Sequence, residues 1–160
     1  MAVVAVNAEL AQNGFRAVNY GVVGGRDEAE WRQIFEFAKM FYLYAVTTEN
    51  VHQLDLLEKL VKEFDIRLAI HNHPRRPNDP NYKVWDPNYV LSVVKDRDSR
   101  IGACADTGHW VRSGLVPVEC LKILEGRIVS SKLTDLNSKS TRENEVPFGT
   151  GGSDHPAVLD

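Results

Sequence analysis

The residues best suited to chemistry occur in short polar groups that follow apolar runs. His71 and His73 come directly after the run 68–70, and their spacing of two puts both imidazoles on one side of an extended chain. Such a pair can ligate a divalent metal, or one ring can bind the metal while the other contacts a substrate. The alternative is a pair of hydrogen-bonded histidines at the entrance of a loop.

A carboxylate and a third histidine form a second group. Asp106 ends the apolar run 102–105, and His109 follows three residues later. A carboxylate at the end of a buried strand costs free energy unless it meets a metal ion or another positive partner, and His109 can return toward the same centre. In the alternative interpretation, Asp106 caps the turn that follows it.

Two further polar side chains complete the candidates. Glu49 directly follows the segment 44–48, and Lys132 lies within the segment 128–135. A lysine that points inward can bind an anion or a sugar oxygen; alternatively, it pairs with Asp135 or faces solvent. The glycine-rich segment 149–152 can wrap a substrate or a phosphate with its backbone N–H groups.

Short β-branched runs alternate with amphipathic segments, and this alternation predicts the elements that position these groups. Strands are expected at 18–23, 44–48, 67–72, 101–106 and 128–135. Helices are expected between them, together with a helix before residue 18 and a helix start at Pro156. Strands that alternate with helices predict a parallel α/β sheet covered on both faces.

Two architectures fit five parallel strands: an open doubly wound sheet and part of an eight-stranded barrel. The glycines within 21–25 match neither the dinucleotide-binding fingerprint nor a P-loop. In both architectures, ligands bind at the carboxyl ends of the strands. Because the polar groups fall at the ends of four expected strands, the sequence predicts one shared site at this rim.

Composition excludes several classes of protein. The chain has 160 residues, of which 19 are basic and 22 acidic, for a net charge of −3. This balance argues against a nucleic-acid-binding polycation, and no apolar run approaches the roughly 20 residues of a membrane span. Cys104 and Cys120 are too few for a disulfide framework or a cysteine-rich zinc site. We therefore expect a cytoplasmic protein that binds neither nucleic acid nor membrane.

Three segments resemble the sugar phosphate isomerase/epimerase family, within the xylose isomerase-like barrel superfamily that also includes endonuclease IV. These segments are 69–74, 102–110 and 135–151, and the most specific of them contains the Asp-Thr-Gly-His sequence 106–109. The resemblance extends from about Phe15 to the C-terminus. It implies a single partial domain over residues 1–160, an incomplete (β/α)₈ TIM barrel of about five βα units.

The resemblance also implies a site and a reaction. Members of this family use a divalent metal, such as Mn, Mg, Co or Zn, to move a proton or hydride between adjacent carbons of a sugar or sugar phosphate. The implied metal ligands are His71 and Asp106, and the implied substrate-binding residues are His73, His109, Lys132 and Glu49. No catalytic residue is assigned.

Two of these positions depart from the family pattern. His71 stands where many relatives carry a catalytic, metal-binding glutamate, and Lys132 stands where relatives commonly have a metal-binding histidine. A full barrel of this kind needs about 250 residues. The resemblance implies that the five expected strands correspond to barrel strands three to seven. We expect a chain with two open sheet edges to be poorly stable or inactive unless it forms a homo-oligomer.

Two alternative functions stay open at this point. One is a non-catalytic sugar-binding remnant of the barrel, which the lysine at position 132 favours. The other is a phosphodiesterase resembling endonuclease IV, which would need three metals and a basic surface for DNA. Five histidines and a net charge of −3 argue against the phosphodiesterase.

Overall fold

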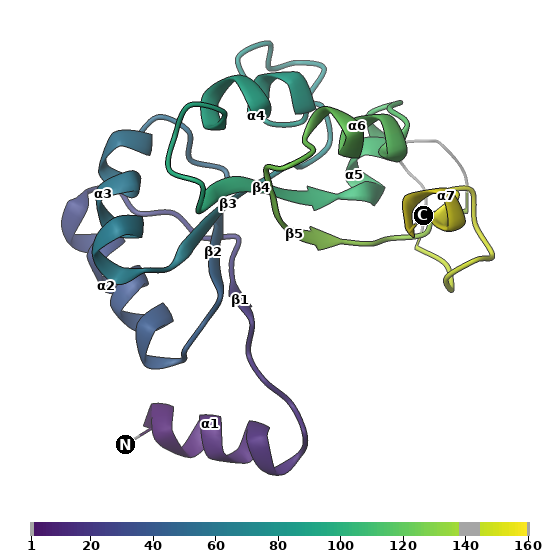
Figure 1. Ribbon diagram of the computed structural model, residues 1–160. Coiled ribbons are helices and arrows are strands. Elements are labelled where there is room, and N and C mark those ends of the chain that lie inside the picture. The colour runs from purple at the N-terminus through teal and green to yellow at the C-terminus, as the bar shows by residue number, and fades with distance from the viewer. Residues whose placement is uncertain (1, 138–144, 160) are drawn as a thin grey trace.

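The computed structural model describes residues 2–137 and 145–159 and contains one parallel sheet (Figure 1). Its five strands pair in chain order: β1 (Asn19–Tyr20), β2 (Ala45–Thr48), β3 (Arg67–His71), β4 (Ile101–Asp106) and β5 (Ile128–Lys132). The connections between them contain α2 (Glu28–Met40), α3 (Leu54–Phe64), α4 (Pro87–Val94), α5 (Thr107–Arg112) and α6 (Pro117–Ile123). Helix α1 (Ala2–Gln12) precedes the sheet, and α7 (His155–Leu159) follows it. The predicted alternation of strands and helices is confirmed.

The sheet is curled into a half-barrel, with the crossover helices on its outer side (Figure 1). In a flat sheet, the first and fifth strands would lie about 19 Å apart, four spacings of about 4.8 Å. Here Asn19 of β1 donates from Nδ2 to Ser130 Oγ of β5 at 3.2 Å. This contact across the interior requires strong curvature, so the expected incomplete TIM barrel is confirmed and the open doubly wound sheet is excluded.

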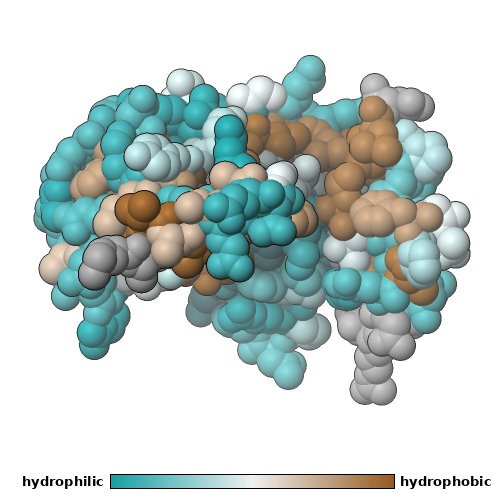
Figure 2. Space-filling model, turned by 90° about the horizontal axis from the view of Figure 1, so that it is seen from below, coloured by the Kyte–Doolittle hydropathy of each residue, from teal (hydrophilic) through white to brown (hydrophobic). Residues whose placement is uncertain are grey.

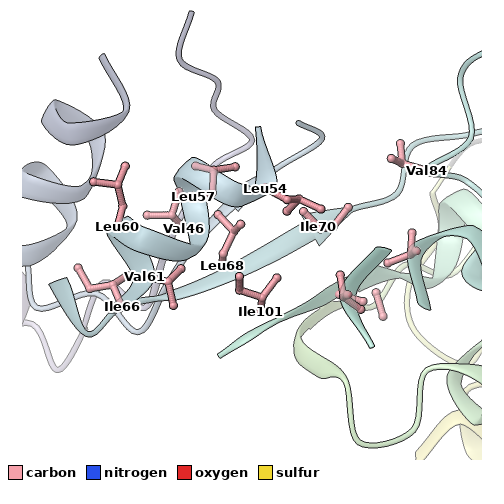
Figure 3. Close-up of a cluster of buried hydrophobic side chains, with 14 of the residues drawn as sticks. Val46, Leu54, Leu57, Leu60, Val61, Ile66, Leu68, Ile70, Val84 and Ile101 are labelled. Carbon is pink, nitrogen blue, oxygen red and sulfur yellow. The ribbon is translucent and has the colours of Figure 1, made fainter. Parts of the chain in front are cut away.

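The core lies between the outer face of the sheet and the helices that cover it. Helix α3 buries four of its apolar residues against β2 and β3 (Figure 3). They are Leu54, Leu57, Leu60 and Val61. All residues of β2 and β4 are buried. The three central strands therefore form a rigid base for the rim where they end.

Aspartate side chains cap the first turns of two helices. Asp27 caps α2 by accepting a hydrogen bond from the backbone N–H of Glu30 at 3.0 Å. Asp86 caps α4 by accepting from the N–H of Asn88 at 2.9 Å, and Pro87 occupies the first turn. Side-chain caps of this kind satisfy N–H groups that the first helical turn leaves free.

The two edge strands are shorter than the sequence predicts, and α5 is an element that it does not predict. Strand β1 covers two residues of the expected 18–23, and β5 ends at Lys132 instead of residue 135. Beyond β5 the chain turns inward, where the N–H of Thr134 donates to Thr107 Oγ1 at 3.2 Å. Within the described residues, no helix is long and apolar enough to cross a membrane.

Candidate functional site

The register of β3, β4 and β5 brings three of the predicted site residues together. His71 is paired with Cys104, and Asp106 is paired with Lys132. Cys104 and Asp106 lie two residues apart on β4, so their side chains point to the same side of the sheet. The side chains of His71, Asp106 and Lys132 therefore converge at the rim of the half-barrel.

Asp106 lies at the centre of this group and uses its two oxygens differently. Its Oδ1 accepts a hydrogen bond from the backbone N–H of His109 at 3.0 Å and so caps α5. Its Oδ2 lies 3.7 Å from His71 Nε2, 3.6 Å from His109 Nε2 and 3.6 Å from Lys132 Nζ. These distances exceed that of a hydrogen bond. Among the described residues, Oδ2 therefore has no hydrogen-bond partner, although Asp106 is fully buried.

The donor atoms around Oδ2 are suited to a divalent metal. The ligand atoms of His71, Asp106 and His109 all lie within 4.8 Å of one another. In a tetrahedral zinc site with bonds of about 2.0–2.1 Å, ligand atoms lie about 3.3–3.4 Å apart, close to the distances found here. A buried anionic oxygen that accepts no hydrogen bond is also a group that a cation would stabilise. Two imidazoles and this carboxylate therefore fit three of the four ligand positions of a Zn²⁺-type site.

The environment of the site favours the protonation states that a metal needs. Burial by itself raises the pKa of Asp106, but the adjacent His71, His109 and Lys132 outweigh it and hold that pKa below its usual value. Burial lowers the pKa of His109 to about 4 despite the nearby carboxylate. At neutral pH, His109 is therefore neutral, as a metal-binding imidazole must be.

Glu49 and His73 form a second group beside the first. Glu49 Oε1 accepts a hydrogen bond from Tyr82 Oη at 2.7 Å and contacts His73 Nδ1, while its Oε2 lies 3.6 Å from Arg76 Nη2. Burial and the hydrogen bond to Glu49 raise the pKa of Tyr82. The ligand atoms of Glu49, His71 and His73 also lie close enough to share a metal. Because Oε1 of Glu49 already accepts a hydrogen bond whereas Oδ2 of Asp106 accepts none among the described residues, the Asp106 group is the stronger candidate.

The two groups meet through their imidazoles and face one cavity. The ring of His73 lies 4.6 Å from that of His71 and 5.0 Å from that of His109, measured between centroids. A cavity of about 310 Å³ opens onto all three rings and onto Lys132. Its other polar side chains are those of Asn19, Thr47 and Ser131. Hydroxyl and amide groups beside a metal-type cluster provide the hydrogen bonds that a polyol needs.

All six residues predicted from the sequence are thus at this rim, but two nearby residues were missed. Asn72 Oδ1 accepts from the N–H of Asp106 at 2.8 Å, and its Nδ2 donates to the carbonyl of Asp106 at 2.9 Å. This buried amide fixes the backbone of the central carboxylate, and its position directly after His71 was the signal for it. Tyr82 had no such signal, because its position depends on the path of the loop before α4.

Asp135 has a different role from the one considered for it. Its carboxylate accepts hydrogen bonds from the N–H groups of Gly149 and Gly151, both at 2.9 Å, and of Leu136 and Ser153, both at 3.1 Å. The interpretation of Lys132 as a partner of Asp135 is wrong, since Lys132 points to Asp106 instead. The N–H groups of Gly149 and Gly151, in the glycine-rich segment, thus bind this carboxylate. Residues 138–144, which belong to the segment 135–151 that resembles the family, lie outside the described part of the chain.

The known proteins that resemble this chain are found among solved structures. No protein-family model matches the sequence, and no curated protein matches it. Among solved structures, an uncharacterized protein from Parabacteroides distasonis ATCC 8503 is 33% identical with a TM-score of 0.69. That alignment covers 85% of this chain and 53% of the other, so this chain spans about half the length of that relative.

Two further structures resemble the chain at lower identity. A xylose isomerase domain protein from Planctomyces limnophilus has a TM-score of 0.75 at 15% identity, covering 98% of this chain and 68% of the other. The IolI protein with a bound zinc atom has a TM-score of 0.64 at 18% identity, covering 91% of this chain and 60% of the other. Several other matches are described as sugar epimerases or sugar phosphate isomerase/epimerases.

These structures confirm the resemblance that the sequence indicates, at the level of the fold. The matched proteins are longer than this chain, and the half-barrel described here aligns with part of each. The chain therefore has the fold of the xylose isomerase-like barrels, and its residues 2–137 and 145–159 form five of their strands.

Proposed function

We propose that the chain carries the site of a divalent-metal-dependent isomerase or epimerase that acts on a sugar or sugar phosphate. The observation that supports this most is the buried Oδ2 of Asp106, which has no hydrogen-bond partner among the described residues and lies 3.6–3.7 Å from two imidazole nitrogens. The zinc atom in the similar IolI protein and the sugar-related descriptions of other matches agree with it.

The ligands would be His71, Asp106 and His109. A divalent ion held there would act as a Lewis acid that polarises a substrate carbonyl and orients the neighbouring hydroxyl. The part of the chain in this step is to hold three donors in a buried, rigid arrangement. Asn72 supports it, because it fixes the backbone of Asp106 from both sides.

His73 is the residue that we propose for proton transfer. Its Nδ1 contacts Glu49, and Glu49 is itself held by Tyr82. A carboxylate in this position keeps the imidazole in one tautomer and leaves Nε2 free to take up or release a proton, as in other carboxylate–histidine pairs. Because His73 lines the cavity, a sugar bound there would lie beside its ring.

The metal part of this proposal is tested by isothermal titration calorimetry. We expect the chain to bind Zn²⁺, Co²⁺ or Mn²⁺ and the Asp106→Asn variant to lose at least tenfold in affinity, because an amide oxygen carries no charge. Asp96→Asn is the matched control, since its carboxylate is exposed and distant from the site. Equal binding by the native chain and the Asp106→Asn variant would contradict the metal assignment.

The reaction is tested by proton exchange with solvent. We expect metal-loaded protein in D₂O to incorporate deuterium next to the carbonyl of a ketose or ketose phosphate, as followed by ¹H NMR. His73→Asn should remove this exchange while metal binding is kept. Metal binding without exchange for any sugar tested would contradict the proposed proton transfer.

A second candidate function is sugar binding without catalysis. The position of Lys132, 3.6 Å from the central carboxylate, favours it, because an ammonium group there neutralises Asp106 without a metal. This candidate predicts that a sugar is bound by the metal-free chain and exchanges no proton. Calorimetric titration with sugars in the presence of a chelator separates the two functions.

A further inference from the structure

An ammonium group lies beside the metal-type cluster of His71, Asp106 and His109. Three nitrogen atoms surround Asp106 Oδ2 at nearly equal distances: 3.7 Å for His71 Nε2, 3.6 Å for His109 Nε2 and 3.6 Å for Lys132 Nζ. The cross-strand pairing of Lys132 with Asp106 fixes this arrangement. Two of the nitrogens suit a metal, whereas the third is a cation that a metal would repel.

The same four residues differ greatly in exposure. The side chains of His71 and Asp106 are 5% and 1% exposed, and that of His109 is 16% exposed, but that of Lys132 is 60% exposed. Lysine has a long side chain with four rotatable bonds and a strongly hydrated end group. Lys132 can therefore leave Oδ2 for solvent with little rearrangement, whereas the three other groups are fixed in place.

We propose that Lys132 competes with the divalent metal for Asp106, so that the metal binds only when the lysine side chain leaves the site. This inference rests on the metal site of the proposed function and adds a control on its occupancy. In the metal-free protein, the ammonium group provides the positive charge that the buried carboxylate needs. A bound metal would provide that charge instead and would repel a nearby ammonium group.

The consequence is a metal affinity that increases when the charge at position 132 is removed. Lys132→Ala should bind metal at least tenfold more tightly than the native chain, because nothing has to be displaced. Lys132→Arg should bind as weakly as the native chain, because it keeps the charge. Lys132→His should bind most tightly, because a third imidazole becomes available beside the two already present.

The experiment measures Co²⁺ and Zn²⁺ binding rather than activity. Calorimetry provides the affinities, and the visible absorption of Co²⁺ reports the coordination geometry, which is intense for a tetrahedral site and weak for an octahedral one. Circular dichroism confirms that each variant is folded. Lys122→Ala is the matched control, since Lys122 is exposed and lies on α6, where it contacts Glu119; its affinity should equal that of the native chain.

The outcomes separate this inference from the proposed function. Tighter binding by Lys132→Ala, with the intense Co²⁺ absorption in Lys132→His, supports the competition. If the native chain and Lys132→Ala bind equally well and both depend on Asp106, the competition is refuted and the metal site stands. If no variant binds metal, both the competition and the metal-dependent function are refuted.

Discussion

At the scale of single residues, Asp106 combines a structural and a chemical task. Oδ1 caps α5 through the N–H of His109, while Oδ2 faces the cluster of imidazoles and Lys132. The two interpretations of this residue from sequence, a helix cap and a metal ligand, are therefore compatible in one side chain. Asparagine can still accept the capping hydrogen bond, so Asp106→Asn removes the charge and leaves the cap.

The buried state of His109 predicts a loss of stability in mild acid. The pKa of His109 is lowered to about 4 in the folded protein by burial, whereas a free histidine has a pKa of about 6.5. Between these values the unfolded chain binds a proton that the folded chain does not. The free energy of unfolding should therefore fall by about 2–3 kcal/mol as the pH decreases from 7 to 4.

Urea unfolding at several pH values, with a chelator present, measures this dependence. His109→Asn should reduce the loss of stability in acid, because the substituted side chain does not titrate. The same substitution at the exposed His52 serves as the control and should leave the pH profile unchanged. An identical profile for the native chain and His109→Asn would show that another group is responsible.

At the scale of elements, the pairing of β4 with β5 positions Lys132 against Asp106. The two strands are in close contact at Gly102, where an added Cβ would lie 2.0 Å from the carbonyl oxygen of Arg127. Next to this contact the register shifts between Ala103 and Cys104. A residue without a side chain allows the close approach, and the irregularity then sets which residue of β5 lies opposite Asp106.

Gly102→Ala should therefore weaken the protein at this junction. A methyl group at that position must push β5 away, and we expect a loss of about 2 kcal/mol or more in the free energy of unfolding. Gly24→Ala is the matched control, because an added Cβ meets nothing within 4 Å there. Equal urea midpoints for the two variants would show that β5 can move away from the added methyl group without a loss of stability.

At the scale of the whole molecule, the half-barrel has two open edges. Within the described residues, β1 and β5 each have one strand neighbour. Hydrophobic side chains also reach the surface, and Figure 2 shows them as brown areas between hydrophilic ones. Among the most exposed are Val4, Phe15 and Tyr42. Unpaired strand edges together with exposed apolar groups favour association.

We therefore predict that the purified chain self-associates through these edges. Sedimentation velocity should show species larger than a monomer, in proportions that increase with protein concentration. Ile128→Lys places a charge on the edge strand β5, where Ile128 is 40% exposed, and should reduce association. Val116→Lys, at another exposed apolar position, is the control. A native chain that remains monomeric at all concentrations would contradict this prediction.

Much of the fold was predictable because it depends on neighbours along the chain. Apolar periodicity identified the five strands and the crossover helices. The rim site also followed from local order, since residues that end parallel strands must meet at one edge. The extents of β1 and β5 did not follow, because an edge strand continues only as far as its one neighbour pairs with it.

The contacts inside the site depend on residues far apart in the sequence, and only the folded chain specifies them. The pairing of Lys132 with Asp106 follows from strand register, and the contact of Glu49 with Tyr82 follows from the path of a loop. Likewise, the glycine-rich segment binds Asp135 because the chain folds back after β5. Residue types and spacing determine which chemistry is available, whereas long-range packing decides which atoms are close enough to perform it.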